Sequence, residues 1–232
     1  MVAKSRGVGR KSKVLALLLI FLLSIGAYLL GWSSVFTVKE IRVVGASTQS
    51  DANVIESASQ ITQGEKLARL EPRVVSVALQ KIAWIDHSTV ARDWIHGRAT
   101  IRVWPRTPVA RFQGRLLDAS GRVFDLPNFV SATLPFVSAK DHPTALFALS
   151  ILTALPPTMK SKLLGISLSG LNSATLSIKD TSRVNAKILQ VTWGDSSNMA
   201  LKVKVYQALI ALPENAQISE MDLSAPYAPI VK

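Results

Sequence analysis

One run of apolar residues constrains this chain more than any other feature. Residues 14–32 read VLALLLIFLLSIGAYLLGW, nineteen positions without a charged side chain. A helix rises about 1.5 Å per residue, so the run would reach about 28 Å, close to the bilayer hydrocarbon thickness of about 30 Å. A helix that is apolar on all sides is otherwise found only inside a large core or in a membrane. We therefore predict a transmembrane helix over residues 14–32.

The charges that flank this run predict its orientation. The first thirteen residues form a basic tail with five basic and no acidic side chains. By the positive-inside rule the tail stays in the cytoplasm and everything after the helix lies outside the cell membrane, as a single-pass type II protein. We expect Lys11 and Lys13 at the inner membrane interface, and Tyr28 and Trp32 in the aromatic belt of the outer one.

A cleaved signal peptide is the alternative interpretation of the same run. The apolar core of a signal peptide usually spans about 7 to 15 residues and ends at small residues in an A-x-A-like site. Here the run is longer, and cleavage after Ala27 would place Ile25 where a small residue is needed. The sequence therefore favours an anchor over a cleaved signal.

Composition excludes several function classes. The net charge is +12, but outside the tail the excess is spread thinly, which suits an anionic lipid surface and argues against a nucleic-acid footprint. The chain has no cysteine, so it has neither disulfides nor thiol chemistry. Its three histidines are not spaced as a zinc site would require. We expect no metal and no cofactor.

Residues 33–108 show the pattern strand, helix, helix, strand, strand. A β-rich run ends at Gly45, Ser50 is a candidate N-cap for a first helix, and Pro72 is suited to the first turn of a second. Two strands, 84–94 and 99–104, then flank Gly97. This order predicts a small α+β domain.

This stretch resembles a POTRA domain, and specifically that of the bacterial FtsQ/DivIB division family. The residues that carry the resemblance are FTVKEIRVVG at 36–45, Gly64 with Leu67 and Leu70, IAWI at 82–85, VARDW at 90–94, IRV at 101–103 and PVA at 108–110. The sequence departs from the family pattern after Trp94, where proline is common, and at Trp104, where an acid is common. Both departures concern strand ends.

Residues 109–232 predict a mostly β domain with two helices. A hairpin is expected over 116–124, with Asp118 serving its turn, and further strands at 134–137, 166–168, 176–178 and 189–193. Asp141 is expected to cap one helix, which ends at Pro156-Pro157, and Ser196 or Ser197 to cap the other. On that second helix we expect a buried face of Leu201, Val205, Leu209 and Leu212, and Lys202, Lys204 and Gln207 facing water.

The succession of a strand ending in Trp-Gly, a lysine-bearing helix and an I-x-x-x-D-L strand resembles the C-terminal part of the FtsQ β domain. The fold class is therefore α+β: an N-terminal transmembrane helix, a POTRA-like β-α-α-β-β domain, and a mixed β-sheet domain with helices. The expected divisions are a cytoplasmic basic tail (1–13), the transmembrane helix (14–32), the POTRA-like domain (33–108) and the FtsQ-type β domain (109–232).

No catalytic constellation emerges from the sequence. Asp86, His87 and Ser88 are adjacent, but neighbours on a strand point to opposite faces and cannot form a relay. The tryptophans at 84, 94 and 104 fit core or rim positions of successive strands. We expect no catalytic residues, and hence no enzyme.

Recognition is the remaining chemistry. A mixed sheet whose last strand lies at the chain end leaves an edge, which can template the addition of a partner's strand. The resemblance implies that FtsB-like and FtsL-like coiled-coil proteins bind there, and the candidate contact residues are Asp222, Leu223, Ser224 and Tyr227. The alternative is that Pro226 and Pro229 merely protect a blunt edge, because each removes a backbone donor.

The resemblance implies a non-catalytic divisome scaffold in the cell membrane at the septum, which binds other division proteins, some through its POTRA-like domain, and supports septal peptidoglycan synthesis. Two other functions stay open at this stage. One is a POTRA-containing, membrane-anchored chaperone or assembly factor in protein translocation or envelope biogenesis. The other is an anchored wall hydrolase.

Overall fold

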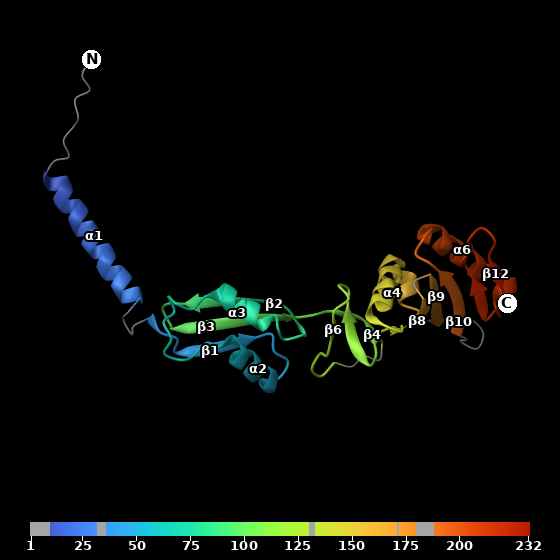
Figure 1. The fold of residues 1–232 in the computed structure, drawn as a ribbon, viewed down its shortest axis with the longest axis horizontal. Helices are drawn as coiled ribbons and strands as arrows, with labels where there is room; N and C mark the ends of the chain where they lie inside the picture. The colour runs from blue at the N-terminus through green and yellow to red at the C-terminus, as the bar shows by residue number, and fades with distance from the viewer. Residues whose placement is uncertain (1–9, 32–35, 130–132, 171, 180–187) are drawn as a thin grey trace, which may run out of the picture. The chain divides into compact units, whose positions relative to one another are not determined.

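A computed structural model describes most of the chain, namely residues 10–31, 36–129, 133–170, 172–179 and 188–232. The chain divides into two compact units, residues 1–105 and 106–232. Figure 1 traces the elements of both units in chain order.

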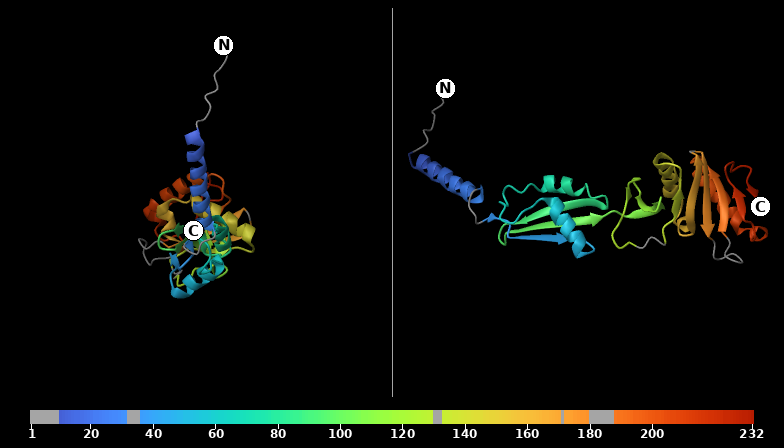
Figure 2. Two further views of the ribbon diagram at one scale, coloured as in Figure 1. Left: turned by 90° about the vertical axis from the view of Figure 1, so that its left-hand side faces the viewer. Right: turned by 60° about the horizontal axis from the view of Figure 1, so that its bottom comes forward.

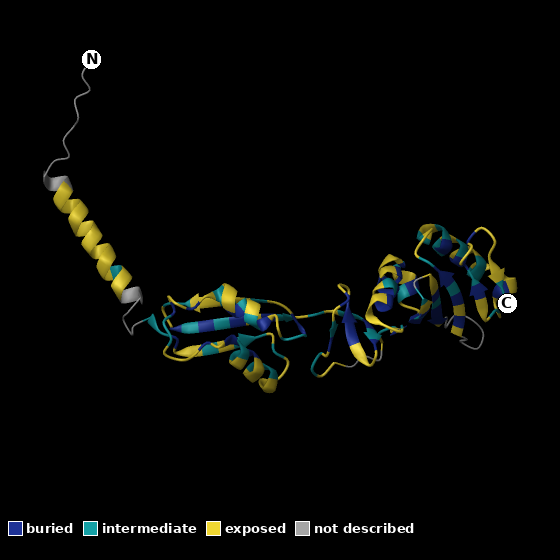
Figure 3. Ribbon diagram, in the orientation of Figure 1, coloured by how far each residue is buried: buried dark blue, intermediate teal, exposed yellow. Residues whose placement is uncertain are grey.

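The first element, α1 (Arg10–Gly31), covers most of the apolar run. Its apolar side chains are exposed throughout the part that is described, as Figure 3 shows. Among the described residues, no helix meets the combined length and apolarity that crossing a bilayer requires. The transmembrane span over residues 14–32 stays a prediction.

The rest of the first unit is a three-stranded sheet with two helices. Its elements are β1 (Glu40–Val44), α2 (Gln49–Ser59), α3 (Pro72–Leu79), β2 (Ile85–Asp93) and β3 (Arg98–Pro105). Strand β3 lies in the centre, parallel to β1 and antiparallel to β2. The right-hand view of Figure 2 shows α2 and α3 beside this sheet from a further direction. The predicted order of strand, helix, helix, strand and strand is confirmed.

Alternation along β3 gives this sheet a covered and an open face. Ala99, Ile101 and Val103 are buried, together with Ile55 of α2 and Leu79 of α3. The residues between them on β3 point the other way, because successive side chains on a strand face opposite sides. The helices therefore cover one face, and the other face carries most of the charged residues of the three strands, namely Glu40, Arg42, Asp93, Arg98 and Arg102.

Local chemistry explains where α2 begins. Thr48 is its N-cap: the Thr48 hydroxyl accepts a hydrogen bond from the Asp51 N–H (3.1 Å), and the Asp51 carboxylate accepts one from the Thr48 N–H (3.1 Å). This reciprocal capping box satisfies two backbone donors at once. Our prediction that Ser50 caps the helix is therefore wrong, since Ser50 lies within the first turn. Pro72 opens α3 as expected.

The second unit is a nine-stranded mixed sheet with helices. Its elements are β4 (Pro108–Phe112), β5 (Arg115–Asp118), β6 (Val123–Phe124), β7 (Phe136–Ser138), α4 (His142–Ala154), α5 (Pro157–Lys160), β8 (Leu163–Gly170), β9 (Ser173–Lys179), β10 (Ile188–Gly194), α6 (Met199–Ala211), the 3-10 turn η3 (Pro213–Asn215), β11 (Glu220–Asp222) and β12 (Ile230–Val231). The strand order is β12-β11-β10-β9-β8-β7-β4-β5-β6. The pairs β4/β7, β7/β8 and β10/β11 are parallel, and the other pairs are antiparallel.

Two carboxylates fix turns of this unit as predicted. Asp141 caps α4 by accepting from the Thr144 N–H at 2.9 Å. Asp118 accepts from the N–H groups of Ser120 and Arg122, each at 2.9 Å, and so closes the β5–β6 turn. Its carboxylate also pairs with Arg106 at 2.9 Å, with both side chains about nine-tenths buried.

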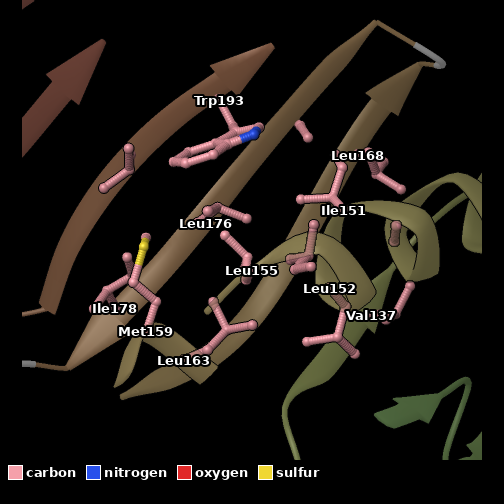
Figure 4. Packing of buried hydrophobic residues seen from close by; sticks show 14 of the residues in the cluster. Val137, Ile151, Leu152, Leu155, Met159, Leu163, Leu168, Leu176, Ile178 and Trp193 are labelled. Carbon is pink, nitrogen blue, oxygen red and sulfur yellow. The ribbon is translucent and has the colours of Figure 1, made fainter. Parts of the chain in front are cut away.

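One apolar cluster joins the helices to the sheet. Figure 4 shows Ile151, Leu152 and Leu155 of the α4 region close to sheet residues that include Val137, Leu168 and Leu176. Trp193 is fully buried, and its indole N–H is 3.0 Å from the Met199 sulfur. The cluster also includes Tyr206 of α6, so α4 and α6 pack on the same face of the sheet.

The predicted faces of α6 are partly wrong. Its fully enclosed positions are Lys202 and Tyr206, whereas Leu201, Val205 and Leu209 are only partly buried and Leu212, beyond the helix, is exposed. The helix starts after Asn198, which adopts a left-handed conformation (φ 51°), and not after Ser196 or Ser197. The burial of Lys202 has a tertiary cause, described below. Lys204 and Gln207 face water as expected.

Candidate functional site

The candidate recognition surface lies at the C-terminal end of the nine-stranded sheet. Strand β11 pairs in parallel with β10 on one side, in the register Val191 to Met221. On its other side β11 pairs with β12, in the register Met221 to Val231. The sequence predicted a last strand that ends at Leu223, whereas the structure adds β12 beyond it. The outermost strand is therefore β12.

Backbone hydrogen bonds define which rim of β12 has no strand paired with it among the described residues. The Lys232 N–H donates to the Glu220 carbonyl at 3.0 Å, and the Lys232 carbonyl accepts from the N–H groups of Ser219 and Glu220. In an antiparallel pair, the residues that bond inward alternate with residues whose N–H and C=O point outward. The N–H and C=O of Val231 therefore point away from β11, along the edge of the sheet.

The four predicted contact residues do not all reach the surface. Tyr227 is 83% exposed, Ser224 is exposed and Asp222 is half-buried. Leu223 is fully buried in the apolar cluster, and its N–H donates to the Thr192 carbonyl at 2.8 Å. A partner could thus touch the side chains of Tyr227 and Ser224, whereas the Leu223 side chain is part of the apolar core and is not accessible to a partner.

Asp222 shapes the turn that leaves β11. Its carboxylate accepts from the Ser224 N–H at 2.8 Å and from the Ser224 hydroxyl at 2.7 Å. This turn directs the chain out of the sheet, and Pro226 and Pro229 lie in the connection to β12. Both prolines are therefore outside the strands, and neither removes a donor from β11 or β12.

A groove accompanies the free edge. It has a volume of about 350 Å³ and lies where β10, β11 and β12 run side by side. Its lining consists of Gln190, Thr192, Glu220, Met221, Asp222, Ile230 and Lys232. The groove combines two carboxylates, a lysine, an amide, a hydroxyl and two apolar side chains. Such a combination can bind an extended peptide segment and recognise one of its side chains.

Lys202, which we predicted to face water, is buried at this end of the sheet and holds it by hydrogen bonds. The Lys202 ammonium donates to the carbonyls of Trp193 (2.8 Å) and Asp195 (3.0 Å) and to the Asp195 carboxylate (3.0 Å). Its side chain is fully buried. Three acceptors satisfy its three donors, which explains how a cation is tolerated there. Hydrogen bonds from Ser197 and then from Lys202 lower the pKa of Asp195 to about 2.

The lysine and the contact residues meet at Gly194. This glycine has φ 74°, and a Cβ placed on it would lie 3.0 Å from the Ser224 Cβ and 3.9 Å from the Lys202 Nζ. The turn held by Lys202 therefore packs directly against the segment that carries Ser224. The only sequence signal for this arrangement is that Lys202 precedes Tyr206 by four residues, on the same side of the helix.

The predicted membrane-interface residues lie in or next to α1. Lys13 and Tyr28 are exposed. The Lys11 side chain and Trp32 lie outside the described residues. Their proximity to lipid stays a prediction.

Of the neighbouring Asp86, His87 and Ser88, the first two side chains meet, but Ser88 points to the other face of the sheet, so the three form no relay. The His87 ring is 3.0 Å from the Asp86 carboxylate and stacks on Trp104 on the open face of the sheet, with ring centroids 4.4 Å apart. Ser88 pairs with Val103 of the covered face, and its hydroxyl is buried without a hydrogen-bond partner among the described residues. Of the three tryptophans at 84, 94 and 104, Trp84 is buried and Trp94 is partly buried.

Two family models match the chain. One is described as a POTRA domain of the FtsQ type and matches residues 36–103. The other is described as the C-terminal part of the cell division protein FtsQ/DivIB and matches residues 109–224, which is half of the chain. The resemblance inferred from the sequence is confirmed.

Two relatives carry the name cell division protein FtsQ. The protein of Mycobacteroides abscessus is 28% identical over 242 aligned positions, which cover 99% of this chain and 73% of the relative. The protein of Salinibacter ruber is 29% identical over 117 positions, which cover 47% of this chain and 45% of the relative. Together with the two matched domains, these similarities show that the chain belongs to the FtsQ/DivIB family of cell division proteins.

Proposed function

We propose that this chain is a non-catalytic scaffold of the division machinery, anchored in the cell membrane by α1. In this proposal the N-terminal tail is cytoplasmic, and the POTRA-like domain (33–108) and the β domain (109–232) lie outside the membrane at the division septum. The β domain binds FtsB-like and FtsL-like partners, the POTRA-like domain binds other division proteins, and the assembly supports septal peptidoglycan synthesis.

The character of α1 supports the anchor. The helix has 22 residues, so at about 1.5 Å per residue it is about 33 Å long, comparable with a bilayer core. From Val14 to Tyr28 its large apolar side chains are exposed, between 40% and 69%. Apolar surface of this extent is stable only when something other than water covers it. The basic tail before it matches a cytoplasmic flank.

The observation that carries the proposed binding role is the free rim of β12. Val231 offers an N–H and a C=O to an incoming strand, Tyr227 in the connection before β12 is 83% exposed, and the groove lined by Glu220 and Asp222 lies across β10, β11 and β12. Main-chain hydrogen bonds along an edge supply affinity, while side-chain pockets supply specificity. Tyrosine is enriched at protein interfaces because its ring supplies apolar contact area and its hydroxyl can form a hydrogen bond.

Two substitutions test this edge in the full chain. Tyr227→Ala removes an exposed aromatic side chain, and Val231→Pro removes the outward N–H without removing a hydrogen bond within the fold. We expect both to reduce co-purification of the coiled-coil partners from membranes at least tenfold, which is about 1.4 kcal/mol. Leu223 is unsuitable for this test, because it is fully buried.

The matched control is Leu146→Ala, which removes a half-exposed apolar side chain from α4, on another part of the domain. This variant should capture partners as the unmodified chain does. A fluorescent fusion should collect at the division site, and depletion should give long undivided cells. Uniform membrane fluorescence in dividing cells, or unchanged capture by both edge variants, would refute the proposal.

A further inference from the structure

The open face of the three-stranded sheet carries a basic strip with no described element packed on it. Pairing places its residues in four rows: Glu40, Arg98 and Asp93; Arg42, Thr100 and Ala91; Val44, Arg102 and Thr89; and Trp104 with His87. The rows come from alternate positions of each strand, so these side chains share one face. We call this surface the open face.

Charges on the open face are unevenly balanced. In the first row Arg98 donates to the Glu40 carboxylate at 2.8 Å, and Asp93 bonds to His96 at 2.7 Å. These acids are therefore engaged at one end of the sheet. In the next two rows Arg42 and Arg102 are exposed, and neither guanidinium has a hydrogen bond or an ion pair among the described residues. Two adjacent cations thus stand without a counter-charge in the middle of the face.

The shape of the open face suits a flat partner. The residues around the two arginines are small, namely Thr100, Ala91 and Thr89, and the last row is an aromatic pair in which His87 stacks on Trp104. Arginine and tryptophan side chains both favour the headgroup level of a bilayer. On the opposite side of the sheet, α2 carries two acids and no basic residue, and α3 carries one arginine, Arg73. On the open face two basic residues, Arg42 and Arg102, occupy neighbouring rows, whereas α2 and α3 together carry a single arginine, Arg73.

We propose that the open face binds the anionic phospholipid headgroups of the membrane that holds α1. This inference rests on the proposed anchor. Only eight residues separate the end of α1 from the start of β1. At about 3.5 Å per residue they span at most about 28 Å, so an anchored chain keeps the sheet close to the lipid surface at all times. A tethered, flat and anionic surface complements two free arginines and an aromatic pair.

Site-directed labelling tests this contact in the full chain held in nanodiscs. The chain has no cysteine, so Thr100→Cys places a single fluorophore on the open face and Ser57→Cys places one on α2. The probe is a nanodisc of phosphatidylcholine alone or mixed with phosphatidylglycerol, with quencher attached to the lipid headgroups. We expect phosphatidylglycerol to increase quenching at position 100 but not at position 57, and high salt to reverse the increase.

Substitutions separate specific from general charge effects. One basic residue near an anionic membrane is worth about a fivefold change in binding, so Arg42→Ala with Arg102→Ala should lower the ratio of docked to undocked protein about thirtyfold. Removing the same charge from α3 and its C-terminal flank, with Arg73→Ala and Lys81→Ala, should leave quenching at position 100 unchanged. Both double variants should unfold at the temperature of the unmodified chain.

The outcomes distinguish this inference from the proposed function. Lipid binding by the open face is overturned if phosphatidylglycerol does not change the quenching at position 100, or if quenching appears only when an acidic protein partner is added. Either result leaves the proposed capture of partners at β12 unaffected. A chain that does not stay in nanodiscs overturns the proposed anchor itself. Equal quenching at positions 57 and 100 refutes the assignment of the contact to the open face.

Discussion

Replacement of Lys202 by methionine tests how far a buried cation stabilises the candidate recognition surface. Methionine keeps the unbranched shape of the lysine stem but removes the three donors to Trp193 and Asp195. Two backbone carbonyls then lose a partner inside the protein. The Asp195 carboxylate, whose side chain is 46% exposed, can turn to water instead. The loss of stability therefore comes mainly from the carbonyl groups of Trp193 and Asp195, which lose their hydrogen-bond donor.

The expected magnitude follows from these acceptors. Each buried polar group left without a partner costs about 1–3 kcal/mol, so the variant should lose about 3 kcal/mol of unfolding free energy after methionine burial offsets part of the total. For a unit of this size such a loss lowers the unfolding midpoint by about 10 °C. The exposed neighbour Lys204→Met is the matched control and should change stability by less than about 0.5 kcal/mol.

Calorimetry of the full chain in micelles, at neutral and acidic pH, measures both effects. Asp195 has a pKa lowered to about 2, below its usual value of about 4. Its contribution to stability is therefore present above about pH 4 and is lost as the pH falls through about 2. Without the lysine this pKa should rise, so less stability should be lost over that pH interval. A Lys202→Met variant as stable as the unmodified chain would show that desolvation of the ammonium outweighs its hydrogen bonds.

Two further substitutions test local features of the fold. Asp118→Ala leaves the nearly buried Arg106 without its carboxylate partner and opens the β5–β6 turn, so it should cost about 3–5 kcal/mol by calorimetry. Burial alone would raise the pKa of Asp118, but hydrogen bonds from Ser120, Arg122 and Arg106 outweigh it and lower the pKa, so the contribution of this carboxylate is lost on acidification. Thr48→Ala removes the observed N-cap of α2 and should cost about 1 kcal/mol in urea unfolding, whereas Ser50→Ala should be nearly neutral; the reverse ranking would contradict the capping box.

Features whose causes lie close together in the sequence could be predicted. Proline at the start of α3, Asp141 before α4 and Gly97 between two β-rich runs each act within a few residues. The central strand of the POTRA-like unit could be predicted because buried apolar residues alternate along it with more exposed ones. The order in the first unit and most of the order in the second therefore followed from local signals, although β4 and β12 were not predicted, and the family resemblance rested on that order.

The missed features depend on partners that are distant in the sequence or on segments too short to show a period. Strand β12 has two residues and follows two prolines, so no pattern marks it, and only its pairing with β11 makes it a strand. Lys202 is an exposed residue by every local criterion, and it is buried because carbonyl groups from the end of β10 and the following turn meet its ammonium. Both features belong to the candidate recognition surface, which is therefore the part that sequence reasoning described least well.

The contrast between these two features explains how such a surface can work. The β10 side is rigid, because a fully buried ammonium ties the end of the strand and Gly194 packs against Ser224. The β12 side is weak, since two residues bury little apolar area and are held mainly by backbone bonds to β11. If a partner strand pairs with the outer rim of Val231, as proposed, it would stabilise β12 from both sides, and partner binding and local folding would be one event. Amide hydrogen exchange should accordingly show fast exchange at 230–231 in the free chain and marked protection there in the complex, while Val191 in β10 stays protected in both.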